Sequence, residues 1–344
     1  MILAPPDGRE RSGSVDVAIV GAGPCGLATA IAAGRQGLSA VVFDASCVVS
    51  SIARYPVYTT FFSSGEKLSI GDIPFVVAGD KPTRRDALAY YRAVSTHYGL
   101  VLRQYEPVVA IRRAEDSFIV RSRPESGDPV ELRASAIVIA TGAFGRENRL
   151  GVPGEDLSHV AHLFREGHEA FDRDAVVVGG GNSAAEAALE LYRSGARVTL
   201  VHFEGELDRR VKPWVGPDLT NRIADGDIAV RWQSRVRAIE PGAVVLDTAA
   251  GGERLAASHV YLLTGHMPDV RLLNDLGARI DPGTGVPEHD PATMQTTVPG
   301  VYIAGVLSGG FDANRIFIEN GRHHGTLIAS HLSARHGASV AAQR

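Results

Sequence analysis

The sequence predicts an α/β protein made of two similarly built domains, the second inserted into the first. A strand, a glycine turn, a helix and a second strand follow one another over residues 16–44, and the same order returns over 175–202. A segment that alternates like an antiparallel meander comes later in each case, over 100–140 and over 228–263. Each meander leads into an apolar strand that ends in Thr-Gly. Short β-branched runs that enter a glycine loop and a small-residue helix are typical of βαβ units.

The repeated order is typical of Rossmann-like dinucleotide-binding domains of the three-layer ββα type. We expect residues 15–145 and 269–344 to form the first domain and residues 146–268 to form the second. Residues 1–14 are rich in Pro, Gly, Arg and Ser. They are therefore expected to be a disordered lead-in and not a signal peptide.

Two further elements belong to the first domain. Thr83 and Asp86 have the spacing of a capping box, which predicts a helix through about Thr96. Near the C-terminus, residues 301–304 predict a strand, which is followed by Gly305 and a helical stretch near residues 315–332.

Length and composition favour a soluble enzyme or binding protein with two ordinary cores. The chain has 344 residues, 44% apolar and 22% charged, with a net charge of −4. No run of like charges or long apolar stretch stands out, so neither nucleic acid nor a membrane is an expected partner. Cys25 and Cys47 are too few for a disulfide framework or a cysteine-based metal site, which favours a cytoplasmic location.

The first glycine loop fits the pattern G-x-G-x-x-G. Gly21 permits a tight turn, Gly23 allows the backbone to approach a pyrophosphate, and Gly26 lets the helix pack on the strand. The helix N-terminus supplies N–H donors to the phosphates, and Asp44 ends the next strand, where an acid accepts the ribose hydroxyls. We assign this loop to FAD. The residues assigned to the FAD site are Gly21, Gly23, Pro24, Cys25, Gly26, Asp44, Thr141, Gly142, Gly305 and Ile318.

The second loop fits G-x-G-x-x-A and is assigned to a nicotinamide cofactor. An acid at the end of the following strand favours NADH, whereas arginines favour the 2′-phosphate of NADPH. Glu204 supports the first alternative, and a cluster of cations just after it supports the second. We take NADPH as the cofactor, with NADH as the alternative. The residues assigned to this site are Gly179, Gly181, Asn182, Ser183, Ala184, His202, Arg209, Arg210 and Lys212.

The C-terminal segment ends in a strand and a glycine that are common at the flavin end of proteins with two dinucleotide sites. Such proteins usually carry an acid after this glycine, but here Val306 follows Gly305. A later helix is expected to direct its N-terminus at the flavin and to stabilise the reduced ring. Phe317 and Ile318 at its start are expected in the core, and Ile318 is also assigned to the FAD site. Glu319, Asn320 and Arg322 fit either a solvated helix face or the flavin site, and His323 and His324 are candidates for proton transfer.

With both loops placed, the chain resembles low-molecular-weight thioredoxin reductases, but it lacks the Cys-x-x-Cys pair of that family. It is more similar to the bacillithiol-disulfide (bacilliredoxin) reductase family of the YpdA type. The segments that carry this resemblance are Gly21–Leu27, Tyr55–Pro56, Phe61–Ser64, Ile70–Phe75, Gly181–Ala184, Glu190–Arg193, Lys212–Trp214, Thr264–Gly265, Pro268–Asp269, Ile316–Arg322 and Gly325.

The resemblance implies an FAD-dependent NADPH oxidoreductase that reduces bacillithiol disulfide or a bacillithiol-capped bacilliredoxin, and it suggests a homo-oligomer. Val306 agrees with this family, which also lacks the acid. Phe203 departs from related reductases, which tend to carry arginine there, and phenylalanine cannot pair with a 2′-phosphate. Selectivity for NADPH therefore requires that Arg209 or Arg210 bind the 2′-phosphate in place of the missing arginine.

Cys25 is the candidate redox residue that the resemblance implies. A helix N-terminus lowers the pKa of a thiol, while a nearby pyrophosphate raises it. The alternative is that Cys25 is a small residue that fits a close contact between helix and cofactor. Electrons would then pass from the flavin to the disulfide directly.

Two other functions fit the same features. A ferredoxin or flavodoxin–NADP reductase can share this plan without a cysteine pair. A non-catalytic flavin-bound redox sensor would signal through a conformational change and turn over no acceptor.

Overall fold

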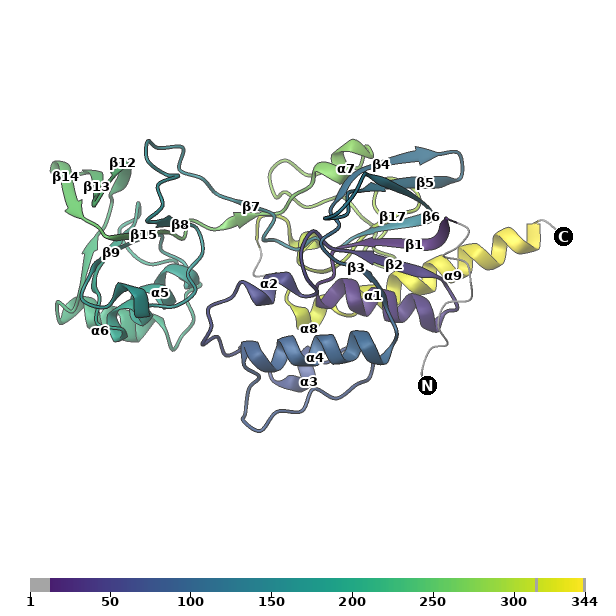
Figure 1. The fold of residues 1–344 in the computed structure, drawn as a ribbon, viewed down its shortest axis with the longest axis horizontal. Helices are drawn as coiled ribbons and strands as arrows, with labels where there is room; N and C mark the ends of the chain where they lie inside the picture. Colours follow the sequence, from purple (N-terminus) through teal and green to yellow (C-terminus); the bar gives the residue numbers. More distant parts are fainter. Residues whose placement is uncertain (1–12, 313–314, 343–344) are drawn as a thin grey trace. The chain divides into compact units, whose positions relative to one another are not determined.

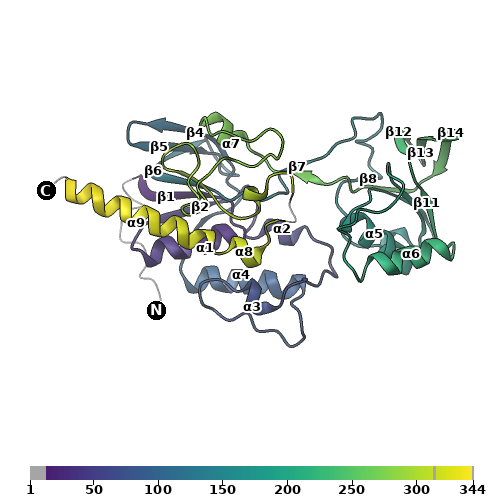
Figure 2. The same cartoon turned by 180° about the vertical axis from the view of Figure 1, so that it is seen from behind.

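The computed structural model describes residues 13–312 and 315–342, drawn as a ribbon in Figure 1 and from behind in Figure 2. The chain divides into two compact units. Unit 1 holds the described parts of residues 1–53, 59–146 and 267–344, and unit 2 holds residues 54–58 and 147–266. Within the described ranges, no helix is long and apolar enough to cross a membrane.

Unit 1 is built on a seven-stranded sheet. Its parallel part has the order β3-β2-β1-β6-β17, and the antiparallel strands β5 and β4 continue from the first half of the long strand β6. The strands are β1 (Ser14–Val20), β2 (Ala40–Phe43), β3 (Val101–Arg103), β4 (Val108–Ala114), β5 (Ser117–Ser122), β6 (Val130–Ile139) and β17 (Val301–Ile303). The carboxyl ends of β1, β6 and β17 therefore meet at one edge, where ligands bind in open α/β sheets.

The helices of unit 1 include two that pack closely together, α1 and α9. An ideal Cβ on Gly325 would lie 2.6 Å from the Cα of Thr29, so the glycine allows this approach. Figures 1 and 2 both show α9 alongside α1. The helical segments are α1 (Pro24–Arg35), α2 (Ser50–Ala53), α3 (Gly65–Leu68), α4 (Arg84–His97), α7 (Arg271–Asp275), the 3-10 turn η3 (Gly305–Gly309), α8 (Ile318–Gly321) and α9 (His324–Ala342). The predicted capping box of Thr83 and Asp86 is confirmed at the start of α4.

Unit 2 has three layers around a parallel sheet of order β11-β10-β9-β15-β8. Alternation along β9 explains the layers, because successive side chains point to opposite faces. Val177 packs with the alanines of α5 and with Leu219 of α6, while Val176 packs with Val244 of the meander. The elements are β8 (Val160–Ala161), the 3-10 turn η2 (His168–Ala170), β9 (Asp174–Val178), α5 (Asn182–Arg193), β10 (Arg197–Val201), α6 (Gly216–Ala224), β11 (Ile228–Arg231), β12 (Arg235–Glu240), β13 (Ala243–Thr248), β14 (Gly251–Ala256) and β15 (His259–Leu262). The predicted fold class, α/β with two Rossmann-like domains, is confirmed. The short strands β7 (Arg146–Glu147) and β16 (His266–Met267) pair with each other where the chain passes between the units.

Three expectations about the elements need correction. The meanders begin later than predicted, because β3 and β11 pair in parallel with β2 and β10. Each of these strands follows a helix, α4 or α6, and a strand that returns through a helical crossover pairs in parallel. The second meander also ends earlier, since β15 is parallel to β9.

The other two corrections concern the ends of the chain. Ser14, placed in the disordered lead-in, is the first residue of β1 and pairs with Arg133, while residues 1–12 of the lead-in lie outside the described residues. The helical stretch near residues 315–332 is two helices, α8 and α9.

Candidate cofactor sites

In the first glycine loop, the surrounding backbone leaves no room for a side chain at two of the glycines, whereas the third faces open space. Gly21 has a φ of +112°, and an ideal Cβ there would collide with the carbonyl oxygen of Ala140. A Cβ on Gly26 would collide with the carbonyl oxygen of Gly21. Around Gly23, by contrast, no described atom comes within 4 Å of an ideal Cβ. Open space at this position is what the close approach of a pyrophosphate needs.

The N-terminus of α1 also fits an anion. Its N-cap is Gly23, Pro24 occupies the first turn, and no side chain of the described residues caps it. No acidic residue lies in this first turn. The N–H groups of the first turn have no partner within a helix, and the helix dipole adds positive charge there.

Asp44 holds the glycine loop to the end of β2. Its Oδ2 accepts a hydrogen bond from Ala22 N and its Oδ1 accepts one from Ser46 N, each at 2.9 Å. These contacts were missed from the sequence, where Asp44 was expected only to accept ribose hydroxyls. Because an ionised carboxylate offers about four acceptor positions, both roles fit the same side chain.

Thr141 has an unpartnered hydroxyl at the same edge of the sheet. Its Oγ1 is buried and has no hydrogen-bond partner in the part of the chain that the structure describes. The corresponding residue of unit 2, Thr264, donates its hydroxyl to Asn148 O at 2.6 Å. Buried polar atoms are normally satisfied, so the Thr141 hydroxyl fits a site that a polar ligand completes. Gly142 and Gly305, both with positive φ, lie after β6 and β17 at this edge.

Cys25 packs into a tight space between α1, Gly305 and α8. Its Sγ lies 2.9 Å from an ideal Cβ on Gly305 and 3.0 Å from one on Gly321. Burial raises the pKa of the Cys25 thiol to about 12. The lowering expected from the helix N-terminus is therefore outweighed by loss of solvent. Both cysteines are free thiols, so no disulfide joins Cys25 to Cys47.

His324, at the start of α9, accepts a hydrogen bond from Gly305 N at its Nδ1, at 3.2 Å. Burial, with a smaller contribution from the charges of His289 and His323, lowers the pKa of His324 to about 4. The ring is therefore neutral near pH 7, as an acceptor must be. His324 fixes the backbone of Gly305 beside Cys25.

The residues of and after α8 hold other segments of unit 1. Glu319 accepts from Ser63 Oγ at 3.1 Å, and the guanidinium of Arg322 donates to Glu66 O at 2.8 Å and to Ser69 Oγ at 3.0 Å. Neither side chain belongs to a free, solvated helix face. Phe317, expected in the core, is 50% exposed because it precedes the single turn of α8, whereas Ile318 is half-buried.

The second glycine loop repeats the arrangement of the first. Gly179 has a φ of +143°, and an ideal Cβ there would lie 2.5 Å from Leu263 O. Gly181 is the N-cap of α5, without a side-chain cap, and no described atom lies within 4 Å of its ideal Cβ. Ala184 is buried under the loop, and Ser183 is exposed at the helix start.

His202 lies directly against this loop. Its ring is 5% exposed, and neither ring nitrogen has a hydrogen-bond partner among the described residues. Burial lowers the pKa of His202. A Cβ on Gly180 would collide with Nε2 and would lie 2.6 Å from Cδ2. Gly180, a variable position of the fingerprint, must therefore be glycine here, which the motif alone did not indicate.

The cations expected to bind a 2′-phosphate already have carboxylate partners. Arg209 pairs with Glu206 at 3.6 Å, Arg210 with Asp208 at 2.9 Å, and Lys212 with Glu186 at 2.5 Å. Asn182 holds the segment in place, since its Oδ1 accepts from Lys212 N and its Nδ2 donates to Arg210 O. The structure thus brings Asn182, Arg210 and Lys212 together beside the glycine loop and leaves Arg209 exposed.

Comparison with known proteins identifies the family. The model of the pyridine nucleotide-disulphide oxidoreductases matches residues 18–305. The bacilliredoxin reductase Bdr of Bacillus subtilis is 41% identical over 322 residues, which cover 92% of this chain and 97% of that protein. The chain belongs to the bacilliredoxin reductase family of pyridine nucleotide-disulphide oxidoreductases.

Solved structures agree with this assignment. The bacillithiol disulfide reductase Bdr (YpdA) from Bacillus cereus has a TM-score of 0.91 and 39% identity, covering 94% of this chain and 99% of that one. A ferredoxin–NADP reductase from Ignicoccus hospitalis is only 26% identical, over 85% of this chain and 90% of that protein. The bacilliredoxin reductase assignment is therefore favoured over the ferredoxin reductase. Its members are oxidoreductases that use a flavin and a nicotinamide cofactor, and the expected enzyme class is confirmed.

Proposed function

We propose that the chain binds FAD in unit 1 and NADPH in unit 2 and passes electrons to bacillithiol disulfide or to a bacillithiol-capped bacilliredoxin. The observation that carries this proposal is the repeated cradle. In each unit the first fingerprint glycine, Gly21 or Gly179, has no room for a side chain, whereas the middle glycine, Gly23 or Gly181, has open space beside an uncapped helix N-terminus. Two such cradles fit two pyrophosphates.

FAD is assigned to unit 1 because the edge of its sheet offers more than a pyrophosphate cradle. The unpartnered hydroxyl of Thr141, the acceptor positions of Asp44 and the turns at Gly142 and Gly305 lie after neighbouring strands. Pro24, Cys25 and Gly26 open the helix that would receive the phosphates, and Ile318 lies at the start of α8. When bound, the two cofactors supply hydride transfer from nicotinamide to flavin.

NADPH is assigned to unit 2, with its pyrophosphate at residues 179–184. His202 supports the loop from below, and Asn182 holds the segment that carries Arg210 and Lys212. These cations follow β10, near the strand end where Rossmann domains bind the ribose of the cofactor, and they add positive charge there. NADH stays the alternative because Glu204 follows the same strand.

The proposed electron acceptor follows from the activities named for two similar proteins. The Bacillus subtilis protein is a bacilliredoxin reductase and the Bacillus cereus protein a bacillithiol disulfide reductase. One hydride from NADPH, which carries two electrons and one proton, together with one proton from solvent reduces one disulfide to two thiols and leaves NADP+. Either Cys25 is the sole nucleophile or the reduced flavin reacts with the disulfide directly. The tight packing and raised pKa of Cys25 favour the direct route.

Steady-state turnover with a panel of acceptors tests this function. We expect NADPH oxidation to depend on bacillithiol disulfide or bacillithiol-capped bacilliredoxin, and ferredoxin to be a poor acceptor. Turnover with ferredoxin alone would support the reductase alternative, and no turnover with any acceptor would support a redox sensor. Light scattering after size exclusion tests the expected homo-oligomer.

A further inference from the structure

In the loop after β10, Phe203 occupies the region where Rossmann domains bind the ribose of the cofactor. Phe203 is 52% exposed, and its ring meets the edge of the His202 ring at a centroid distance of 4.7 Å. A phenyl ring cannot bind a phosphate. Selectivity for the 2′-phosphate therefore needs a cation that reaches this position from another segment.

The segment after β11 lies beside Phe203. Ser234 N donates to His202 O at 3.0 Å, and Gln233 N donates to Glu204 O at 2.9 Å. Residues 233 and 234, which follow β11, thus contact residues 202–204, and Arg235 comes directly after them. Two arginines of this segment, Arg231 and Arg235, are the nearest candidates by chain position.

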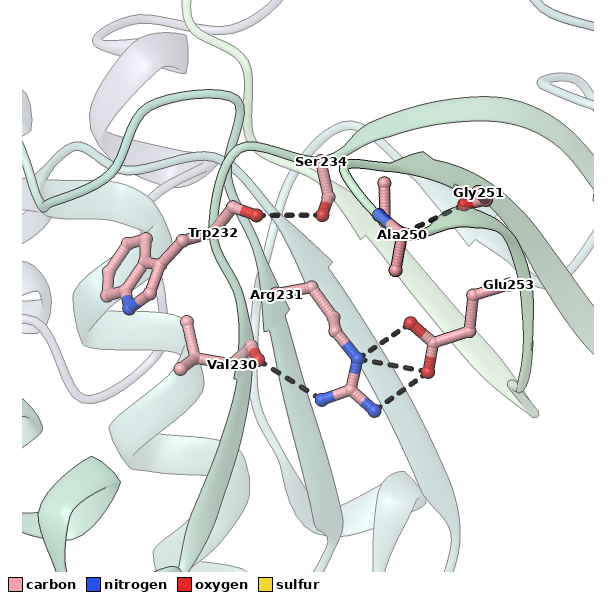
Figure 3. A network of polar contacts seen from close by, with 8 residues as sticks. Val230, Arg231, Trp232, Ser234, Ala250, Gly251 and Glu253 are labelled. Atoms are coloured by element: carbon pink, nitrogen blue, oxygen red, sulfur yellow. Dashed lines mark hydrogen bonds and ion pairs between the residues drawn. The ribbon is translucent and has the colours of Figure 1, made fainter.

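Arg231 is occupied. Its guanidinium contacts both carboxylate oxygens of Glu253 at 2.8–3.0 Å and donates to Val230 O, as Figure 3 shows. In the same view Ser234 turns its hydroxyl to Trp232 O. The Arg231–Glu253 pair lowers the pKa of Glu253, so this carboxylate stays charged and keeps the arginine bound near neutral pH.

Arg235 has a different environment. The first residue of β12, it is exposed, and its guanidinium carbon lies 5.0 Å from the centroid of the Phe203 ring. None of the described carboxylates forms an ion pair with it. Its neighbour Arg237 pairs with Asp247 at 3.4 Å. Carboxylates also pair with the other nearby cations, Arg209, Arg210, Lys212 and Arg231. Arg235 therefore lies at the start of β12, beside Phe203, without a carboxylate partner among the described residues.

We propose that Arg235, stacked on Phe203, is the residue that recognises the 2′-phosphate of NADPH. Arginine combines stacking on an aromatic ring with paired donors that match a phosphate. Phe203 then holds the guanidinium in place, and no reorganisation of an existing ion pair is needed. This inference rests on the proposed binding of a nicotinamide dinucleotide in unit 2 and adds the residue that selects between NADPH and NADH.

Binding of two nucleotide fragments tests the proposal without flavin or acceptor. Calorimetry on the full chain compares 2′,5′-ADP with 5′-AMP. We expect Arg235→Ala to weaken 2′,5′-ADP by about 10- to 100-fold and to leave 5′-AMP unchanged, because hydrogen bonds to charged groups have this strength. Arg235→Lys keeps the positive charge but loses the paired donors of the guanidinium, so we expect an intermediate loss of affinity for 2′,5′-ADP. Arg237→Ala, two residues along the same strand, is the matched control and should bind both fragments as the wild type does.

Two results would overturn the proposal. One is a wild-type chain that binds 2′,5′-ADP no more tightly than 5′-AMP. The other is Arg235→Ala with an unchanged preference for 2′,5′-ADP. The proposed function can fail separately: a chain whose Arg235 selects 2′,5′-ADP but which reduces no disulfide would retain this inference and lose the assigned acceptor.

Discussion

The imidazole ring of His202 fills the space beside Gly180 that a side chain at residue 180 would occupy. The ring is buried, and neither of its nitrogens has a hydrogen-bond partner among the described residues. Its packing therefore links the end of β10 to the glycine loop at the start of α5. The shape of the glycine loop to which we assign the nicotinamide cofactor therefore depends on this contact as well as on the fingerprint glycines.

Gly180→Ala should disturb the second glycine loop through its contact with His202. The added methyl group must displace the His202 ring, so we expect the stability of unit 2 to fall by about 1–3 kcal/mol and the affinity for NADPH to fall with it. Gly181→Ala is the contrasting variant, since its ideal Cβ meets open space. It should keep the wild-type thermal unfolding and still lose NADPH affinity. Equal unfolding of Gly180→Ala and the wild type would disprove the role of this contact.

The same contrast is expected in unit 1. Gly26→Ala brings a Cβ into the carbonyl oxygen of Gly21 and should destabilise the fold, whereas Gly23→Ala should fold normally and lose flavin. Thermal unfolding of the apoproteins and the visible absorbance of bound flavin separate the two effects. Gly23→Ala with a full complement of FAD would contradict the assigned pyrophosphate position.

Both glycine loops and the ββα layering could be predicted from the sequence, because they depend on local spacing and on periodicity. The direction of β3 and β11 could not, since alternation along a strand does not specify its partner. The contacts of Arg322 with α3 and the residue after it were also missed, because they join residues 253 to 256 positions apart. For Cys25, the sequence shows its place at a helix N-terminus but not its burial beside Gly305 and Gly321, and this burial raises its pKa.

Cys25 should react slowly with alkylating agents. Burial raises its pKa to about 12, so only a trace of thiolate is present at neutral pH, and the alkylation rate should rise with pH well beyond the range of an ordinary thiol. The measurement uses Cys47→Ser, so that Cys25 is the only thiol, with the denatured chain as reference. A rate that levels off below about pH 8 would reveal a stabilised thiolate and support Cys25 as nucleophile.

Cys25→Ser should retain bound flavin, NADPH oxidation and disulfide reduction if the reduced flavin reacts with the disulfide directly. Loss of disulfide reduction alone, with flavin reduction by NADPH unchanged, would assign the electron transfer to Cys25. Cys47→Ser is the control and should behave as the wild type in both reactions.

The stability of unit 1 should fall in mild acid through His324. The pKa of this ring lies at about 4 in the folded chain, below its ordinary value of 6.5. Between these values the unfolded chain binds more protons than the native one, so the contribution is fully present above pH 6.5 and is lost as the pH falls toward 4. In denaturant unfolding, His324→Gln should flatten this slope, while His97→Gln, at the exposed end of α4, should keep it. An unchanged slope in His324→Gln would contradict the assignment.

Anaerobic stopped-flow absorbance of the flavin-loaded chain tests the central claim most directly. We predict that NADPH bleaches the flavin in a rapid phase and that one equivalent of bacillithiol disulfide then restores its oxidised spectrum. A flavin that NADPH does not reduce, or a reduced flavin that bacillithiol disulfide and bacillithiol-capped bacilliredoxin both leave unchanged, would contradict the account.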